Sequence, residues 1–116
     1  MKFKLVLAMV NDDRTDDVIE KAREMGATGA TVITAAKGEG LNPSKTFFGL
    51  TLEGQVDVVL FVVEEHMSRV ILEGISEVGE FDDVKGAGVA LQIDIEDAIG
   101  LKSQLDKIKE EIEEQI

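Results

Sequence analysis

The sequence predicts an α+β fold in which two β-α-β units build one antiparallel sheet with two helices on one face. Three observations support this prediction. Two apolar, β-branched runs are each followed by a stretch with helical spacing of its apolar residues, and each stretch leads to a further β-favouring run. The 116 residues suffice for one domain and are too few for two independent cores. Hydrophobic residues make up 44% of the chain, which is enough to fill such a core.

The first half of the chain reads as strand, helix and strand. Residues 3–10 form a short apolar run that Asn11-Asp12-Asp13 closes, as is typical of a buried strand followed by a turn. From Thr15 the apolar residues recur at steps of three and four until Gly26, which predicts an amphipathic helix with a glycine stop. Residues 29–34 are again β-branched, and a loop with glycine and proline follows them.

The second half repeats this order. Residues 56–63 are dominated by valine, leucine and phenylalanine and give the strongest strand signal in the chain. A helix is predicted from Glu64 to Gly79, residues 89–95 form the fourth strand, and residues 101–116 form a C-terminal amphipathic helix. The chain, residues 1–116, is therefore predicted to be one domain with the ferredoxin-like order β-α-β-β-α-β.

Two helices on one face leave the other face of the sheet without a cover. The run at residues 56–63 is apolar at positions that point to both faces, so the uncovered face would be a large apolar patch. Either another chain or the C-terminal helix must cover it. We expect a homo-oligomer.

Composition excludes several classes of function. The chain has 24 acidic and 12 basic residues and a formal charge of -12, so we expect no binding to nucleic acid. It has no cysteine and a single histidine, His66, which excludes disulfides, thiolate chemistry and multi-histidine metal centres. Glu64-Glu65-His66 is interpreted as a charged helix start, and no metal site and no catalytic residue are predicted. The chain is expected to be cytoplasmic, not an enzyme and not inserted in a membrane.

Two short glycine loops are candidates for binding an anion. Lys37-Gly38-Glu39-Gly40 follows the second strand, and Lys85-Gly86-Ala87-Gly88 precedes the fourth. Glycines allow close approach to a ligand and turn successive N–H groups toward an anion, and a lysine adds positive charge. Two ordinary turns at the corners of a sheet explain the same residues equally well.

The segment from residue 40 to residue 54 is predicted to be a loop with two adjacent aromatic residues, Phe47 and Phe48, and a nearby cation, Lys45. Apolar residues in a loop pack within the oligomer or recognise a partner, and both interpretations stay open here.

Over residues 3–102 the order and spacing of these features resemble the P-II nitrogen-regulatory signal proteins, and in particular their shorter P-II-like relatives. The resemblance rests on KGEG after the second strand, on VDVVLFVVEEH, and on KGAGVALQIDIEDAIGL at the fourth strand. It implies a cytoplasmic homotrimer that binds adenine nucleotides in clefts between subunits. It also implies a mobile loop, here residues 40–54, that contacts a client transporter or metabolic enzyme.

The resemblance also implies a set of nucleotide-binding residues: Lys37, Gly38, Gly40, Lys85, Gly86, Ala87, Gly88 and Lys102. The sequence departs from the family pattern at a phosphate-binding lysine, which is Val89 here, and at one of two basic residues, which is Gly100. The loss of these charges favours ADP or AMP over ATP as the effector, and no further cofactor is required. Because Leu41 and Asn42 replace family residues and the chain has no tyrosine, uridylylation is excluded and sensing of 2-oxoglutarate is not expected.

A second class of function is compatible with the same fold. A ferredoxin-like trimer without nucleotide, similar to the divalent-cation-tolerance proteins, would act as a metal-binding or interaction module.

Overall fold

The computed structural model describes residues 2–36, 46–47, 50–51 and 56–101. In chain order its elements are β1 (Phe3–Asn11), α1 (Thr15–Glu24), β2 (Thr31–Ala36), β3 (Thr46–Phe47), β4 (Leu50–Thr51), β5 (Val56–Glu64), α2 (Glu65–Gly79) and β6 (Gly88–Asp94). The predicted strands and the first two predicted helices are confirmed, with ends that differ by one or two residues. The C-terminal helix predicted for residues 101–116 lies outside the described residues apart from Leu101.

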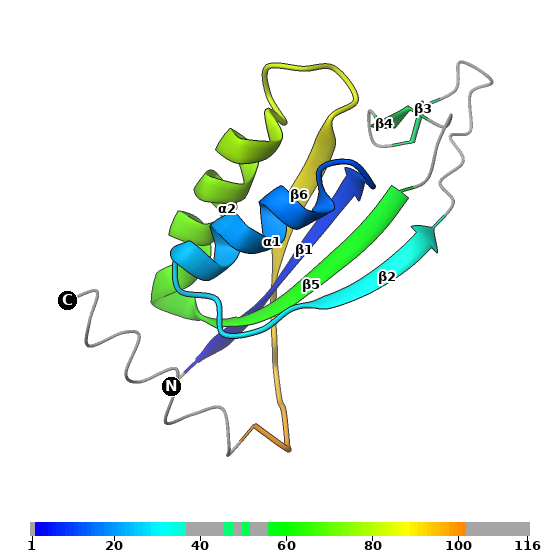
Figure 1. The fold of residues 1–116 in the computed structure, drawn as a ribbon. Coiled ribbons are helices and arrows are strands. Elements are labelled where there is room, and N and C mark those ends of the chain that lie inside the picture. The colour runs from blue at the N-terminus through cyan, green and yellow to red at the C-terminus, as the bar shows by residue number, and fades with distance from the viewer. Residues whose placement is uncertain (1, 37–45, 48–49, 52–55, 102–116) are drawn as a thin grey trace.

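The main sheet has the strand order β2-β5-β1-β6, and each neighbouring pair is antiparallel. Helices α1 and α2 both lie on one face of this sheet (Figure 1). This is the predicted ferredoxin-like α+β arrangement. It follows from the β-α-β order of each half, because each helix carries the chain across the same face of the sheet.

The segment predicted to be a loop contains a small second sheet. Strands β3 and β4 pair antiparallel, with Thr46 opposite Thr51 and Phe47 opposite Leu50. The prediction of a plain loop over residues 40–54 was therefore wrong at these four positions. Threonine and phenylalanine favour strands, and this preference outweighs the surrounding glycines and polar residues.

Alternation along the central strands builds the core. Val59, Phe61 and Val63 of β5 are buried, and Val6, Ala8 and Val10 of β1 are fully buried beside them. The helices contribute Val18 and Ala22 from α1 and Ile71 and Ile75 from α2, all without solvent exposure. The core thus occupies the single layer between the helices and the sheet.

The two helices end in different ways. Gly26 has a φ of 115° just after α1, which is the predicted glycine stop. After α2 the left-handed residue is Glu80, with a φ of 55°, and Gly79 is the last helical residue. Gly79 allows close packing instead, because a Cβ there would meet the ring of Phe81, which would have to shift.

Candidate functional site

The second glycine loop lies between α2 and β6 and forms a compact turn. Val84 donates its N–H to the carbonyl of Glu80 at 2.9 Å, and Ala87 donates to the carbonyl of Val84 at 3.1 Å. Gly86 has a φ of 78°, a conformation that side chains with a Cβ rarely adopt. The loop therefore needs a glycine at this position for its shape, whether or not it binds a ligand.

The turn leaves two successive backbone N–H groups for an external acceptor. Within the described residues, no backbone carbonyl accepts from the N–H of Lys85 or of Gly86, and the side chain of Lys85 is exposed. Successive N–H groups around a left-handed residue form an anion-binding concavity. Ala87 is buried with its N–H already bonded, and Gly88 begins β6 opposite Val10. The anion-binding groups of this loop are thus centred on Lys85 and Gly86.

Strand β2 ends at Ala36, at the same end of the sheet as the Lys85-Gly86 turn but on the opposite edge. Ala36 lies opposite Val56, Val56 lies opposite Asn11, and Gly88 lies opposite the neighbouring Val10. The two outer strands are separated by three strand spacings, about 14 Å. Within one chain, the end of β2 therefore does not contact the start of β6.

Six of the predicted site residues lie outside the described residues: Lys37, Gly38, Gly40, Lys45, Phe48 and Lys102. Phe47 is in β3, where its backbone pairs with Leu50. The predicted site residues that the structure places together are Lys85, Gly86, Ala87 and Gly88.

The face of the sheet opposite the helices is apolar across all four strands. Leu7 of β1 lies between Leu60 of β5 and Leu91 of β6, and one row further on Met9 lies between Val58 and Val89. At its margins Ile33 is 51% exposed and Ile93 is 46% exposed. No described helix covers this face (Figure 1). It is the uncovered apolar patch that the sequence predicts, and an apolar surface of this kind marks an interaction site.

A cavity of about 480 Å³ lies over one end of this open face, within the size range of small-molecule sites. Its lining is Leu5, Thr28, Gly29, Ala30, Thr31, Leu60, Val62, Gly100 and Leu101. Sequence reasoning missed it. The available signal was the run of small residues Thr28-Gly29-Ala30, which leaves space where α1 leads into β2.

The cavity and the Lys85-Gly86 turn lie at opposite ends of the sheet. Leu5 lines the cavity, whereas Asn11, at the other end of β1, contacts the turn through Gly86. Asn11 is six residues of extended strand from Leu5, or about 20 Å, and four residues from Leu7, which lies opposite the cavity residue Leu60, or about 13 Å. A single small ligand that used both features would have to take them from two different chains.

A second cavity, of about 470 Å³, lies between α2 and β6. Four carboxylates line it, from Glu73, Glu77, Asp82 and Asp83, with one cation, Arg69. Arg69 is itself paired with Glu73 at 3.0 Å. The excess of negative charge repels phosphate, so this cavity is unsuited to an anionic ligand.

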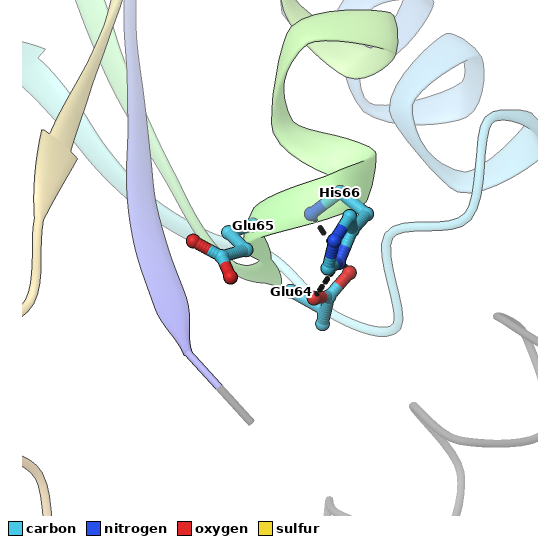
Figure 2. A group of neighbouring side chains, drawn as sticks. All are labelled: Glu64, Glu65 and His66. Carbon is cyan, nitrogen blue, oxygen red and sulfur yellow. Dashed lines mark hydrogen bonds and ion pairs between the residues drawn. The ribbon is translucent and has the colours of Figure 1, made fainter.

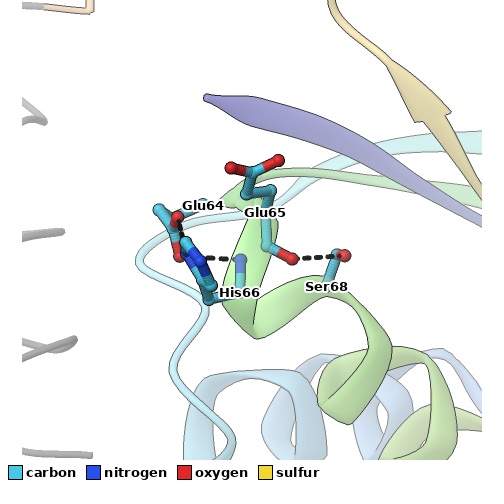
Figure 3. A network of polar contacts seen from close by, with 4 residues as sticks. All are labelled: Glu64, Glu65, His66 and Ser68. Atoms are coloured by element: carbon cyan, nitrogen blue, oxygen red, sulfur yellow. Dashed lines mark hydrogen bonds and ion pairs between the residues drawn. The ribbon is translucent and has the colours of Figure 1, made fainter. Parts of the chain in front are cut away.

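The cluster at the start of α2 caps that helix. Glu64 is buried, and its carboxylate accepts from the backbone N–H of His66 at 2.8 Å and lies 2.5 Å from His66 Nδ1 (Figure 2). The hydrogen bond that the protonated imidazole donates to Glu64, followed by the negative charge of Glu64, raises the pKa of His66 above 6.5. Ser68 Oγ donates to the carbonyl of Glu65 at 2.9 Å in the same first turn (Figure 3). Ligand atoms of Glu64, Glu65 and His66 lie within 4.8 Å of one another, but the Glu64 oxygens already serve the helix and the imidazole. The interpretation as a charged helix start is confirmed.

Among the described residues, no helix is both long enough and apolar enough to cross a bilayer.

The family model described as nitrogen regulatory protein P-II matches residues 3–105. No curated protein sequence matches the chain significantly.

Solved structures share the fold. A P-II-like protein, CPII, from Thiomonas intermedia K12, in a structure with ADP, AMP and acetate, is 19% identical, with 81% of this chain and 86% of that chain covered and a TM-score of 0.64. The same protein with ADP and bicarbonate is 18% identical, with 82% and 87% covered and a TM-score of 0.62. A putative PII-like signaling protein from Thermus thermophilus is 24% identical, with 82% and 88% covered and a TM-score of 0.61. At these identities the likeness establishes the fold.

Proposed function

Because the chain belongs to the P-II family of nitrogen regulatory proteins, we propose that it is a regulatory protein that binds an adenine nucleotide between the subunits of a homotrimer. One observation carries the proposal. The turn suited to an anion and the cavity suited to a small organic group are separated along the sheet by about 13–20 Å, from Asn11 to the cavity residues Leu60 and Leu5. Two neighbouring chains are needed to bring such features together around one ligand.

The phosphates bind at the Lys85-Gly86 turn in this proposal. Its two N–H groups, which no described backbone carbonyl engages, and its exposed lysine supply local positive charge on a chain whose net charge is -12, against the nearby carboxylates of Asp82 and Asp83. The residues Lys37, Gly38, Gly40 and Lys102 assist from the neighbouring segments, as the family pattern implies. The base binds in the cavity beside Thr28 and Leu60, where apolar side chains and threonine hydroxyls suit a heteroaromatic ring.

ADP or AMP is the preferred nucleotide in this proposal. The structures of the Thiomonas protein that contain ADP, or ADP with AMP, support this class of ligand. Val89 and Gly100 stand where the family carries basic residues, and each missing charge-assisted hydrogen bond forfeits about 1.5–3 kcal/mol. The third phosphate of ATP would therefore add charge that this chain cannot fully compensate.

The open apolar face is the trimer interface, and the segment from residue 40 to residue 54 contacts the client. The centre of the open face, with Leu7, Leu60 and Leu91 side by side, offers the apolar area that a permanent interface requires. Lys45, Phe47 and Phe48 supply the cation and aromatic groups that are enriched in recognition surfaces. The client is a transporter or a metabolic enzyme in the cytoplasm, and the chain itself performs no catalysis.

Calorimetric titration with AMP, ADP and ATP tests the nucleotide assignment. We expect binding of ADP or AMP, with ATP weaker, and a loss of affinity in Lys85→Gln. Lys21→Gln on α1 removes the same charge away from the turn and serves as the matched control. A trimer that binds none of the three nucleotides would contradict the proposal and favour the alternative of an interaction or metal-binding module.

A further inference from the structure

The Lys85-Gly86 turn is attached to the region between β1 and α1 by two side chains. Asn11 is the last residue of β1, and Arg14 directly precedes α1. The residues that they contact in the turn, Gly86 and Glu80, come 75 and 66 positions later in the chain. These are tertiary contacts between the β1–α1 connection and the loop that precedes β6.

Arg14 holds the beginning of the turn. Its Nη2 lies 2.9 Å from Oε2 of Glu80, and the two side chains are 35% and 47% exposed. Glu80 is the left-handed residue that ends α2, and the N–H of Arg14 donates to the carbonyl of Asn11 at 2.9 Å. The backbone of Arg14 is held by its hydrogen bond to Asn11, and that of Glu80 by the end of α2. The ion pair therefore joins two well-ordered segments of the backbone.

Asn11 holds the other end of the turn. Its Nδ2 donates to the carbonyl of Gly86 at 3.4 Å, while the N–H of the same peptide group, that of Ala87, donates to Val84. Both polar groups of the Gly86-Ala87 peptide are therefore bonded, on opposite sides. These two bonds fix the plane of the Gly86-Ala87 peptide group. They also restrain the direction in which the preceding N–H groups, those of Lys85 and Gly86, point.

The ring of Phe81 supports the turn from below. A Cβ on either Gly79 or Gly88 would collide with this ring, so the ring lies directly against both glycine backbones. The turn is thus packed on one side and bonded at both ends, while Lys85 stays exposed. Preorganised donors bind an anion more tightly, because no ordering cost arises on binding.

We propose that Asn11 and Arg14 are positioning residues for the anion-binding turn, so that they set its affinity for phosphate without contacting the ligand. This inference rests on the proposed nucleotide function. It assigns a ligand-linked role to Asn11, which the sequence presents as part of an ordinary turn after the first strand, and to Arg14, which follows that turn.

Charge reversal separates positioning from direct electrostatics. Glu80→Arg breaks the ion pair yet adds positive charge beside the turn, so simple attraction would strengthen ADP binding and positioning would weaken it. We expect ADP to bind about two- to fivefold more weakly to Glu80→Arg and to Arg14→Glu, a range that corresponds to one exposed ion pair. The double variant Arg14→Glu/Glu80→Arg restores the pair and should restore affinity. Asn11→Leu, which removes the donor at similar size, should weaken ADP binding by a similar factor.

Adenosine separates the positioning role from a general structural defect, because such a defect would weaken the binding of adenosine as well as that of ADP. It lacks phosphates, so its affinity, measured by competition, should be the same in all variants. Arg23→Glu makes the same charge change on α1, about 13 Å along the helix from Arg14, and should leave the ADP affinity near that of the wild type. Thermal melting of each variant verifies that it folds.

The outcomes distinguish the two proposals. Weaker ADP binding in both single charge variants, with recovery in the double variant and unchanged adenosine binding, supports the inference. Equal ADP binding in the wild type and the single variants, or tighter binding in Glu80→Arg, overturns the inference alone. A wild type that binds no nucleotide overturns the proposed function and this inference with it.

Discussion

Leu7→Asp tests whether the open face holds the oligomer together. Leu7 is at the centre of the sheet, opposite Leu60 on one side and Leu91 on the other, and it points away from the helices. Its neighbours in the strand, Val6 and Ala8, point into the core and are fully buried. The substitution therefore alters the open face and leaves the core intact.

The expected magnitude follows from burial. A leucine buried in an interface contributes about 1.5–3 kcal/mol, so loss of three equivalent copies costs a trimer about 5–9 kcal/mol before the charge is counted. A carboxylate trapped in the apolar interface adds several kcal/mol per copy. Since each 1.4 kcal/mol changes an equilibrium constant about tenfold, association should weaken by at least about a thousandfold.

Light scattering at micromolar concentration gives the answer. The wild type should have three times the chain mass of 12.6 kDa, and Leu7→Asp should have the mass of a single chain. Leu7→Met keeps the face apolar and should remain a trimer. Circular dichroism should show folded secondary structure in all three proteins. An unchanged trimer in Leu7→Asp, or a monomeric wild type, would refute the assignment of this face.

Three further predictions concern the packing of the core, the glycine at the start of β6 and the ionisation of His66. Phe61→Ala should lower the free energy of unfolding by about 3–5 kcal/mol in urea titrations, because the ring is 2% exposed at the centre of the core; a loss below about 1 kcal/mol would contradict this packing. Gly88→Ala should cost about 1–3 kcal/mol in the same assay, because a Cβ there would meet both Phe81 and the carbonyl of Met9, whereas Gly29→Ala, with open space around it, should be neutral. The hydrogen bond that the His66 imidazolium donates to Glu64 raises the pKa of His66. The stabilising effect of this pair is therefore complete below about pH 6.5 and disappears as pH rises through the raised pKa. The melting temperature of the wild type should therefore exceed that of His66→Gln at acidic pH and converge with it at alkaline pH, and an NMR titration of this one histidine should give a pKa above 6.5.

Local pattern was sufficient to predict the main secondary structure. The apolar run at residues 56–63 and the helical stripe that ends at Gly79 correspond to β5 and α2, because burial on one face imposes a fixed period on the sequence. The hairpin of β3 and β4 was missed. Its strands have two residues each, which is too short for any period to appear.

The candidate site was predictable only in part. The KGAG loop was found because glycine and lysine are locally distinctive, and Gly86 does adopt a positive φ. The cavity beside Thr28 and Leu60 was missed, since it joins a helix-strand connection to the middle of a distant strand and to Gly100. The sequence also could not predict which N–H groups of the turn lack a backbone acceptor among the described residues, because the Ala87 N–H is bonded only once the turn has closed.

By itself the sequence determined the order of elements, the absence of thiol chemistry, the acidic charge and the existence of an apolar second sheet face. These properties depend on composition and on short-range periodicity, which one chain carries along its length. Only the tertiary structure decided that the Lys85-Gly86 turn and the 480 Å³ cavity lie at opposite ends of β1, and that Asn11 and Arg14 reach across to the turn. Strand register and contacts between distant residues set those positions, and neither is encoded in any single segment.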